Sequence, residues 1–176
     1  GQSKTNVMSL AAAEITAVNV QVGDIVKEGD PLVTLDQKDI EKQIAELKTN
    51  INNANAVAAN DEAQKQNSLT QNKQDQQDAL DAAQKTIDKA QADVDKYKKK
   101  VSECEDYIYY LKNNHKDTSE YDGKLDVFKS SLETAQNALD SANDNYASVL
   151  KNTDRSVASA QNTVDMQKYQ TSTTRD

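Results

Sequence analysis

The chain has 176 residues with a net charge of -8, which leaves no basic face for a nucleic-acid partner. Only 36% of the residues are hydrophobic and 5% aromatic, too few for one large globular core but suited to long helices with a narrow apolar stripe. A single Cys excludes an internal disulfide, and the sequence contains no Ser/His/Asp set, phosphate-binding loop or zinc-ligand spacing. We therefore expect a protein that is not an enzyme and that holds no cofactor or metal.

The first predicted element is a small β module within residues 1–36. Apolar and polar residues alternate over Thr16–Val22, the pattern of a half-buried strand. Gly23-Asp24 and Gly29-Asp30 supply two turns, because Gly takes positive φ at no steric cost and Asp bonds nearby backbone. Leu32–Leu35 is predicted to form the last strand.

A long helix is predicted to follow at once, since no Gly or Pro occurs between positions 32 and 122. Asp36 is the expected N-cap, with Asp39 near the positive helix end. Apolar residues then recur at alternating spacings of three and four, which indicates that the helix pairs along one stripe. This seam consists of Ile40, Ile44, Leu47, Ile51, Ala54 and Ala58, then Leu80, Ala83, Ile87, Ala90, Val94, Tyr97, Val101, Cys104, Ile108 and Leu111. The two runs are out of phase, so the polar stretch 52–78 between them predicts a stutter, a kink or a break.

The chain is predicted to turn at 113–117 and to return as a second helix. Asn tolerates the left-handed conformation at a helix end, and two residue pairs, Asp117 with Glu120 or Ser119 with Asp122, have capping-box spacing. The return seam is Leu125, Phe128, Leu132, Ala135, Leu139, Ala142, Tyr146 and Val149, continuing less regularly through Val157, Ala160 and Val164. Folding at about residue 117 pairs Ile108 with Phe128, Cys104 with Leu132, and Val94 with Ala142.

The predicted fold class is therefore mainly α. An antiparallel two-helix coiled-coil hairpin (37–176), with its tip near 113–119, is attached to the β module of residues 1–36. At 1.5 Å per residue the first helix spans about 115 Å and the second about 80 Å. Either the chain ends before the second helix has returned, which we favour, or the first helix breaks in its polar middle.

The β module and its junction with the helix resemble a known family. The segment VNVQVGDIVKEGDPLVTLD, from Val18 to Asp36, resembles the first half of a biotinyl/lipoyl domain. Its direct passage into a long helix resembles the half-lipoyl (barrel-sandwich) junction of the membrane fusion proteins, the HlyD-like periplasmic adaptors. This resemblance implies a non-catalytic adaptor subunit of an envelope efflux or secretion system that bridges an ABC-type permease and ATPase to the exterior.

The resemblance also implies a hexamer on the extracytoplasmic face of the cell membrane, in a periplasm or a Gram-positive cell envelope. Because residue 1 is Gly and no membrane span is evident, we expect the membrane anchor outside this sequence. Adaptors that reach an outer-membrane duct carry Arg-x6-Leu-x3-Ser at the tip, but Arg155 and Arg175 are the only arginines here. An outer partner is therefore left open.

Aromatic residues are concentrated near the predicted tip. The candidate contact residues are Tyr107, Tyr109, Tyr110, His115 and Tyr121, and we expect Tyr109 and Tyr110 to be at least partly exposed. Exposed tyrosines are frequent contact residues in interfaces, so the tip is predicted to dock against a partner or a neighbouring subunit. The alternative is that these rings only stabilise the end of the hairpin.

Two other classes of protein remain open. A biotin or lipoyl carrier with a coiled-coil extension would bear its modification on Lys38, although the hairpin that displays the lysine in carriers is missing. A structural surface coiled coil would recruit no transporter. We expect Cys104, which occupies a seam position, to be a buried structural thiol.

Overall fold

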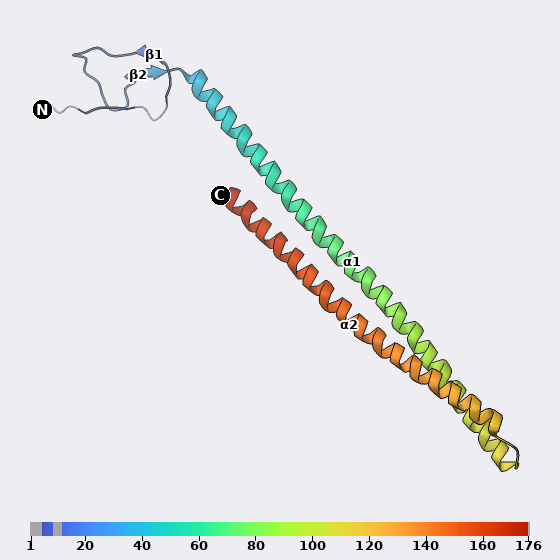
Figure 1. The fold of residues 1–176 in the computed structure, drawn as a ribbon. Coiled ribbons are helices and arrows are strands. Elements are labelled where there is room, and N and C mark those ends of the chain that lie inside the picture. Colours follow the sequence, from blue (N-terminus) through green and yellow to red (C-terminus); the bar gives the residue numbers. More distant parts are fainter. Residues whose placement is uncertain (1–4, 9–11, 176) are drawn as a thin grey trace. The chain divides into compact units, whose positions relative to one another are not determined.

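A computed structural model describes residues 5–8 and 12–175 of the chain (Figure 1). Strands β1 (Ile15–Val18) and β2 (Val33–Leu35) precede helices α1 (Gln37–Asn113) and α2 (Ser119–Arg175), so the predicted mainly α class is confirmed. Residues up to Asn60 form one compact unit and Asp61–Thr174 form a second, and each is described by itself below. Residues 1–4 and 9–11 of the predicted β module, and residue 176 of the predicted hairpin, lie outside the described part.

The first unit contains a two-stranded antiparallel sheet. β1 pairs with β2 so that Ile15 faces Leu35 and Val18 faces Val33, with an irregularity between Ile15 and Ala17. The strand predicted to reach Val22 ends at Val18, because the chain enters a turn three residues later. The predicted extent of this strand was wrong, whereas the position of the last strand is confirmed.

Both predicted turns are present and are built alike. They span Gln21–Asp24 and Lys27–Asp30, and the third residue of each is a Gly with a φ of 98° and 92°, respectively. The N–H of the last residue donates to the carbonyl of the first at 3.1 and 3.0 Å. The Asp carboxylate in turn accepts a hydrogen bond from the N–H of the first residue at 2.8 and 2.9 Å. Positive φ at the third position is the requirement of a type II turn and explains the Gly at each site.

Helix α1 runs for 77 residues without interruption, so the stretch 52–78 is helical and the predicted break is excluded. Side-chain amides bridge successive turns here: Gln71 donates to Asp75, Gln74 to Asp78 and Gln77 to Asp81, at 2.8–2.9 Å. Such pairs four residues apart stabilise a helix that has little apolar surface. Across the described residues, the structure contains no helix with the length and hydropathy needed to span a membrane.

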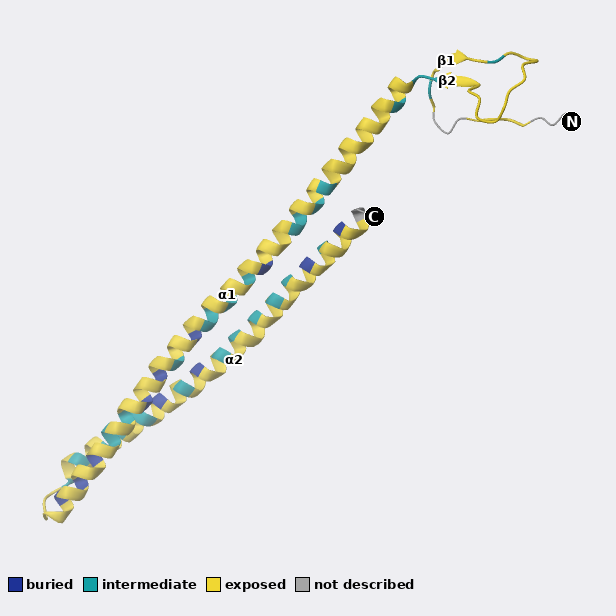
Figure 2. Ribbon diagram, turned by 180° about the vertical axis from the view of Figure 1, so that it is seen from behind, coloured by how far each residue is buried: buried dark blue, intermediate teal, exposed yellow. Residues whose placement is uncertain are grey.

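In the second unit α1 and α2 pack against each other, and the buried residues lie along their facing sides (Figure 2). They are Leu69, Ala83, Ala90, Val94, Cys104, Ile108 and Leu111 on α1, with Ala135, Ala142, Val164 and Thr171 on α2. The predicted pairing along this seam was wrong. The Lys100 ammonium lies 5.3 Å from the Phe128 ring, whereas Ile108, eight residues further along α1, was the predicted partner of that ring.

Candidate functional site

The tip of the hairpin begins with a C-cap that the sequence did not place correctly. His115 takes a left-handed φ of 54°. Its N–H donates to the Lys112 carbonyl at 3.1 Å, and the Lys116 N–H donates to the Leu111 carbonyl at 2.9 Å. This pair of hydrogen bonds is the Schellman arrangement, in which the left-handed residue is usually Gly or Asn. His is one of the non-Gly residues enriched in that conformation, so the cap falls at His115 instead of at an Asn.

Helix α2 is capped by Asp117 and Thr118. The Asp117 carboxylate accepts hydrogen bonds from the backbone N–H and the hydroxyl of Ser119 at 3.0 and 2.7 Å. The Thr118 hydroxyl donates to the Asp122 carboxylate at 2.8 Å. The hydrogen bonds therefore differ from both predicted capping-box pairs, although the turn itself lies where it was predicted. The hydrogen bonds from Ser119 to the ionised carboxylate lower the pKa of Asp117.

This lowered pKa predicts a pH-dependent contribution of Asp117 to stability. A carboxylate whose pKa is lower in the folded state stabilises the fold above its unfolded pKa, and this stabilisation is lost as the pH falls through the folded pKa. Asp117→Ala should therefore lower the melting temperature of the hairpin at pH 7, and the difference from the unsubstituted protein should shrink below about pH 4. Thermal unfolding followed by circular dichroism between pH 2 and 7 measures both. A difference that is independent of pH would contradict a role for the ionised carboxylate.

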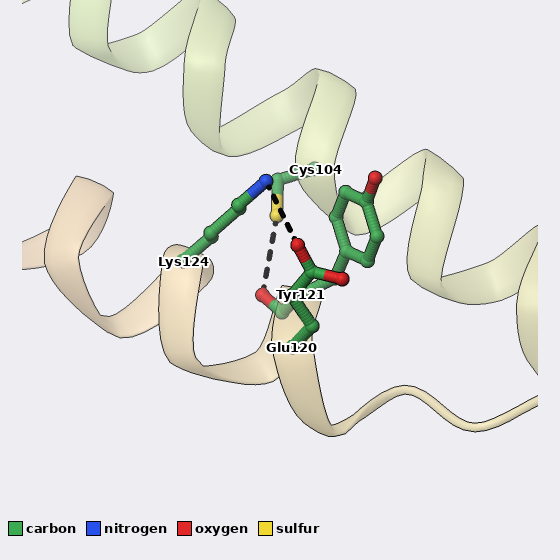
Figure 3. A network of polar contacts seen from close by, with 4 residues as sticks. All are labelled: Cys104, Glu120, Tyr121 and Lys124. Atoms are coloured by element: carbon green, nitrogen blue, oxygen red, sulfur yellow. Dashed lines mark hydrogen bonds and ion pairs between the residues drawn. The ribbon is translucent and has the colours of Figure 1, made fainter.

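Three of the predicted tyrosines form one aromatic cluster, which we call the tip cluster: Tyr107, Tyr110 and Tyr121. The ring of Tyr107 stacks on Tyr110 with centroids 5.8 Å apart and meets Tyr121 edge-on at 4.5 Å. The Lys124 ammonium lies 4.7 Å from the Tyr121 ring and pairs with the Glu120 carboxylate at 3.4 Å. Figure 3 shows this ammonium beside Cys104, between the two helices.

The tip cluster and the residues beside it present aromatic surface. Tyr109 is 69% exposed and Tyr110 50%, as predicted, and His115 is also exposed in the turn. Among the described residues, neither Tyr109 nor His115 makes a ring contact with the tip cluster. The structure thus brings three of the five predicted contact residues together and leaves two on the surrounding surface.

Next to the tip cluster lies a hollow of about 340 Å³. It is lined by Lys100, Glu103, Cys104, Tyr107, Tyr121, Lys124 and Phe128. The Cys104 thiol is buried, as predicted, and donates to the Tyr121 carbonyl at 3.4 Å. Sequence reasoning missed the lysines of this hollow. The signal for Lys124 was its position one helical turn after Tyr121, whereas Lys100 is near Phe128 only because of the register between the helices.

A second candidate contact surface is the β module of the first unit. None of the described residues up to Asn60 is buried, and Val22 and Ile25 are almost fully exposed. A hollow of about 480 Å³ in this module is lined only by apolar residues: Val7, Met8, Ile15, Leu32, Val33 and Leu35. The seam residues Ile44, Leu47 and Ile51 at the start of α1 are exposed too.

Comparison of the chain with protein-family models, with curated proteins and with solved structures gave no match. Within the described ranges, no three His, Cys, Asp or Glu side chains are placed to hold a metal ion together. The surfaces that remain to be explained are the exposed apolar β module and the aromatic tip.

Proposed function

We propose that the chain is an adaptor subunit of an envelope export system, which links a membrane transporter of the ABC type to the exterior without catalysing a reaction. The observation that carries this proposal is the β module, in which every described apolar side chain is exposed or half-exposed. The module leads directly into a 77-residue helix. Such a module suits an adaptor in which a second polypeptide segment covers the exposed apolar side chains. The completed module would then hold the base of the long hairpin in place.

The exposed apolar surface of the first unit favours assembly. Monomeric proteins rarely expose large contiguous apolar patches, and an uncovered edge of a short sheet readily pairs with another strand. In this proposal a complementary half-module covers the hollow beside Ile15 and Leu35 and completes a lipoyl-type barrel sandwich. Completed modules from several copies would pack side by side in a ring, a hexamer by the family resemblance.

The aromatic tip supplies the distal contact in this proposal. Tyrosines bury a large area at little cost in conformational entropy, and they are enriched among the residues that dominate binding energy. Tyr109 and Tyr110 are the most exposed tyrosines of the tip. The ring of Tyr107 stacks on Tyr110 and is itself contacted edge-on by Tyr121. The partner is a neighbouring copy or a further component of the export system.

The direct test is an affinity pull-down of the full-length protein from its own cell membranes, read by mass spectrometry. Near-stoichiometric recovery of an ABC permease or ATPase is the expected result. Recovery of a carboxylase or acyltransferase complex, with a mass increment on Lys38, would replace the proposal by the carrier function. Lys38 lies in the first turn of α1, where its backbone N–H donates to the Asp36 carboxylate at 2.9 Å. Because the residue is in a helix and not on the hairpin that displays the lysine of a carrier, we expect no mass increment. A well-folded protein without any membrane partner would indicate a structural coiled coil instead.

The tip contact has its own prediction. The double substitution Tyr109→Ser and Tyr110→Ser should reduce distal-partner recovery roughly tenfold or more, because hot-spot aromatic residues contribute about 2 kcal/mol or more each. Helix content and transporter recovery should not change. The matched control is Tyr169→Ser, which removes an exposed tyrosine from α2 far from the tip in sequence. Equal losses in both variants would show that the tip has no special role.

A further inference from the structure

Halfway along the second unit, the two helices are joined by a layer of polar side chains. The Gln76 amide donates to the Thr153 hydroxyl at 2.9 Å and to the Asp154 carboxylate at 2.6 Å. The Thr153 hydroxyl itself donates to the Val149 carbonyl at 2.7 Å, so it is free to accept from Gln76. We call Gln76, Thr153 and Asp154 the polar layer.

The polar layer interrupts the apolar seam. On α1 the neighbouring buried residues are Leu69 and Ala83, and on α2 they are Ala142 and Val164. Between these limits the described side chains that face the partner helix are only half-buried. Hydrophobic packing is therefore weak at this level, and the hydrogen bonds from Gln76 are the specific contact between the helices.

Both helices change their periodicity at the polar layer. On α1 the half-buried positions Asn72, Gln76 and Leu80 are separated by four and four residues, and Ala79, three residues after Gln76, is half-buried too. On α2 the half-buried positions Val149, Thr153 and Val157 are separated in the same way. An extra step of this kind is a stutter, which locally unwinds the supercoil. Thr153 is the central residue of the stutter on α2, and it contacts Gln76, which directly precedes the doubled half-buried positions Ala79 and Leu80 on α1.

The polar layer also distinguishes between two registers of the hairpin. The apolar seam alone is compatible with a pairing displaced by about two helical turns, in which Ile108 faces Phe128. In that register Gln76 would face Ala160, and Thr153 would face Ala83. The amide would lose both of its partners, and the stutters of the two helices would no longer coincide. The half-buried amide would give up two hydrogen bonds, one of them to a carboxylate, which favours the observed register.

We propose that the polar layer selects the register of the hairpin. The apolar seam brings the helices together, and the match of Gln76 to Thr153 and Asp154 fixes their relative position. A single polar residue in the seam of a coiled coil can specify register in this way at some cost in stability. Register determines which residues meet at the tip, since Lys100 reaches Phe128 only in the observed pairing.

Disulfide trapping in the full chain tests this proposal, in a Cys104→Ala background. Asp93 and Ala138 line one hollow between the helices, so the pair Asp93→Cys with Ala138→Cys reports the observed register. The pair Asp93→Cys with Asn145→Cys reports the register displaced by one heptad, a shift of about 10 Å. With an intact polar layer only the first pair should form a disulfide. With Gln76→Leu, Thr153→Val and Asp154→Ala, we expect disulfide formation by the second pair to rise roughly tenfold or more.

The matched control is Gln84→Leu with Asp88→Ala. These residues share an amide–carboxylate hydrogen bond of 3.0 Å within α1 and do not contact α2 through it. In this variant only the cysteine pair at positions 93 and 138, which reports the observed register, should form a disulfide. Should the triple variant lose its helical circular dichroism, Gln76→Leu with Thr153→Val keeps Asp154 and is expected to give the same result. If a variant without the polar layer folds and still forms only the disulfide between positions 93 and 138, the proposal is overturned.

Discussion

Val164→Asp should unfold much of the second unit, with a loss of roughly 3 kcal/mol or more in the free energy of unfolding. Val164 is 0% exposed, the most completely buried large side chain among the described residues. An Asp carboxylate at this position would be removed from water. Urea unfolding followed by circular dichroism at 222 nm measures the loss.

The control for this substitution is Val127→Asp, on the same helix. Val127 is 63% exposed, so the same chemical change there leaves the carboxylate in water and should alter the free energy of unfolding by no more than about 0.5 kcal/mol. Similar losses in both variants would mean that burial along the seam does not hold the helices together.

Gly23→Val should disrupt the β module and leave the helical hairpin unchanged. Gly23 has a φ of 98°, and no atom lies within 4 Å of the position of an added Cβ, so the cost comes from the backbone conformation alone. A left-handed conformation costs an L-residue about 1–2 kcal/mol, which is large for a module in which none of the described residues is buried. The N–H of Asn19 donates to the Leu32 carbonyl at 2.8 Å, so the chemical shift and hydrogen exchange of this amide report the state of the module.

A second glycine provides the contrast. Gly123 lies within α2 with open space around its Cβ position, so Gly123→Ala should stabilise the helix by about 0.5–1 kcal/mol.

Gly23→Val should not change the circular dichroism at 222 nm. An unchanged Asn19 amide in Gly23→Val would show that the turn tolerates a β-branched residue, and unchanged ring assembly would count against the proposed role of the module.

The sequence by itself determined the elements of this protein. The run without Gly or Pro and the spacing of apolar residues predicted both helices, and the two Gly-Asp pairs predicted both turns of the β module. These features are local: positive φ requires Gly, helix propensity acts over a few residues, and a narrow apolar stripe repeats every seven. The exposure of Tyr109 and Tyr110 and the burial of Cys104 followed from their positions relative to that stripe.

Only the tertiary structure decided how these elements meet. A heptad seam looks the same when one helix slides by seven residues, so apolar spacing could not choose between Ile108 and Val101, the neighbour of Lys100, as the seam residue at the level of Phe128. That choice depends on the hydrogen bonds of Gln76 to Thr153 and Asp154, which join residues 77 and 78 positions apart. The left-handed cap at His115 is set by short-range hydrogen bonds, from the N–H groups of His115 and Lys116 to the carbonyls of Lys112 and Leu111, which the apolar spacing does not indicate.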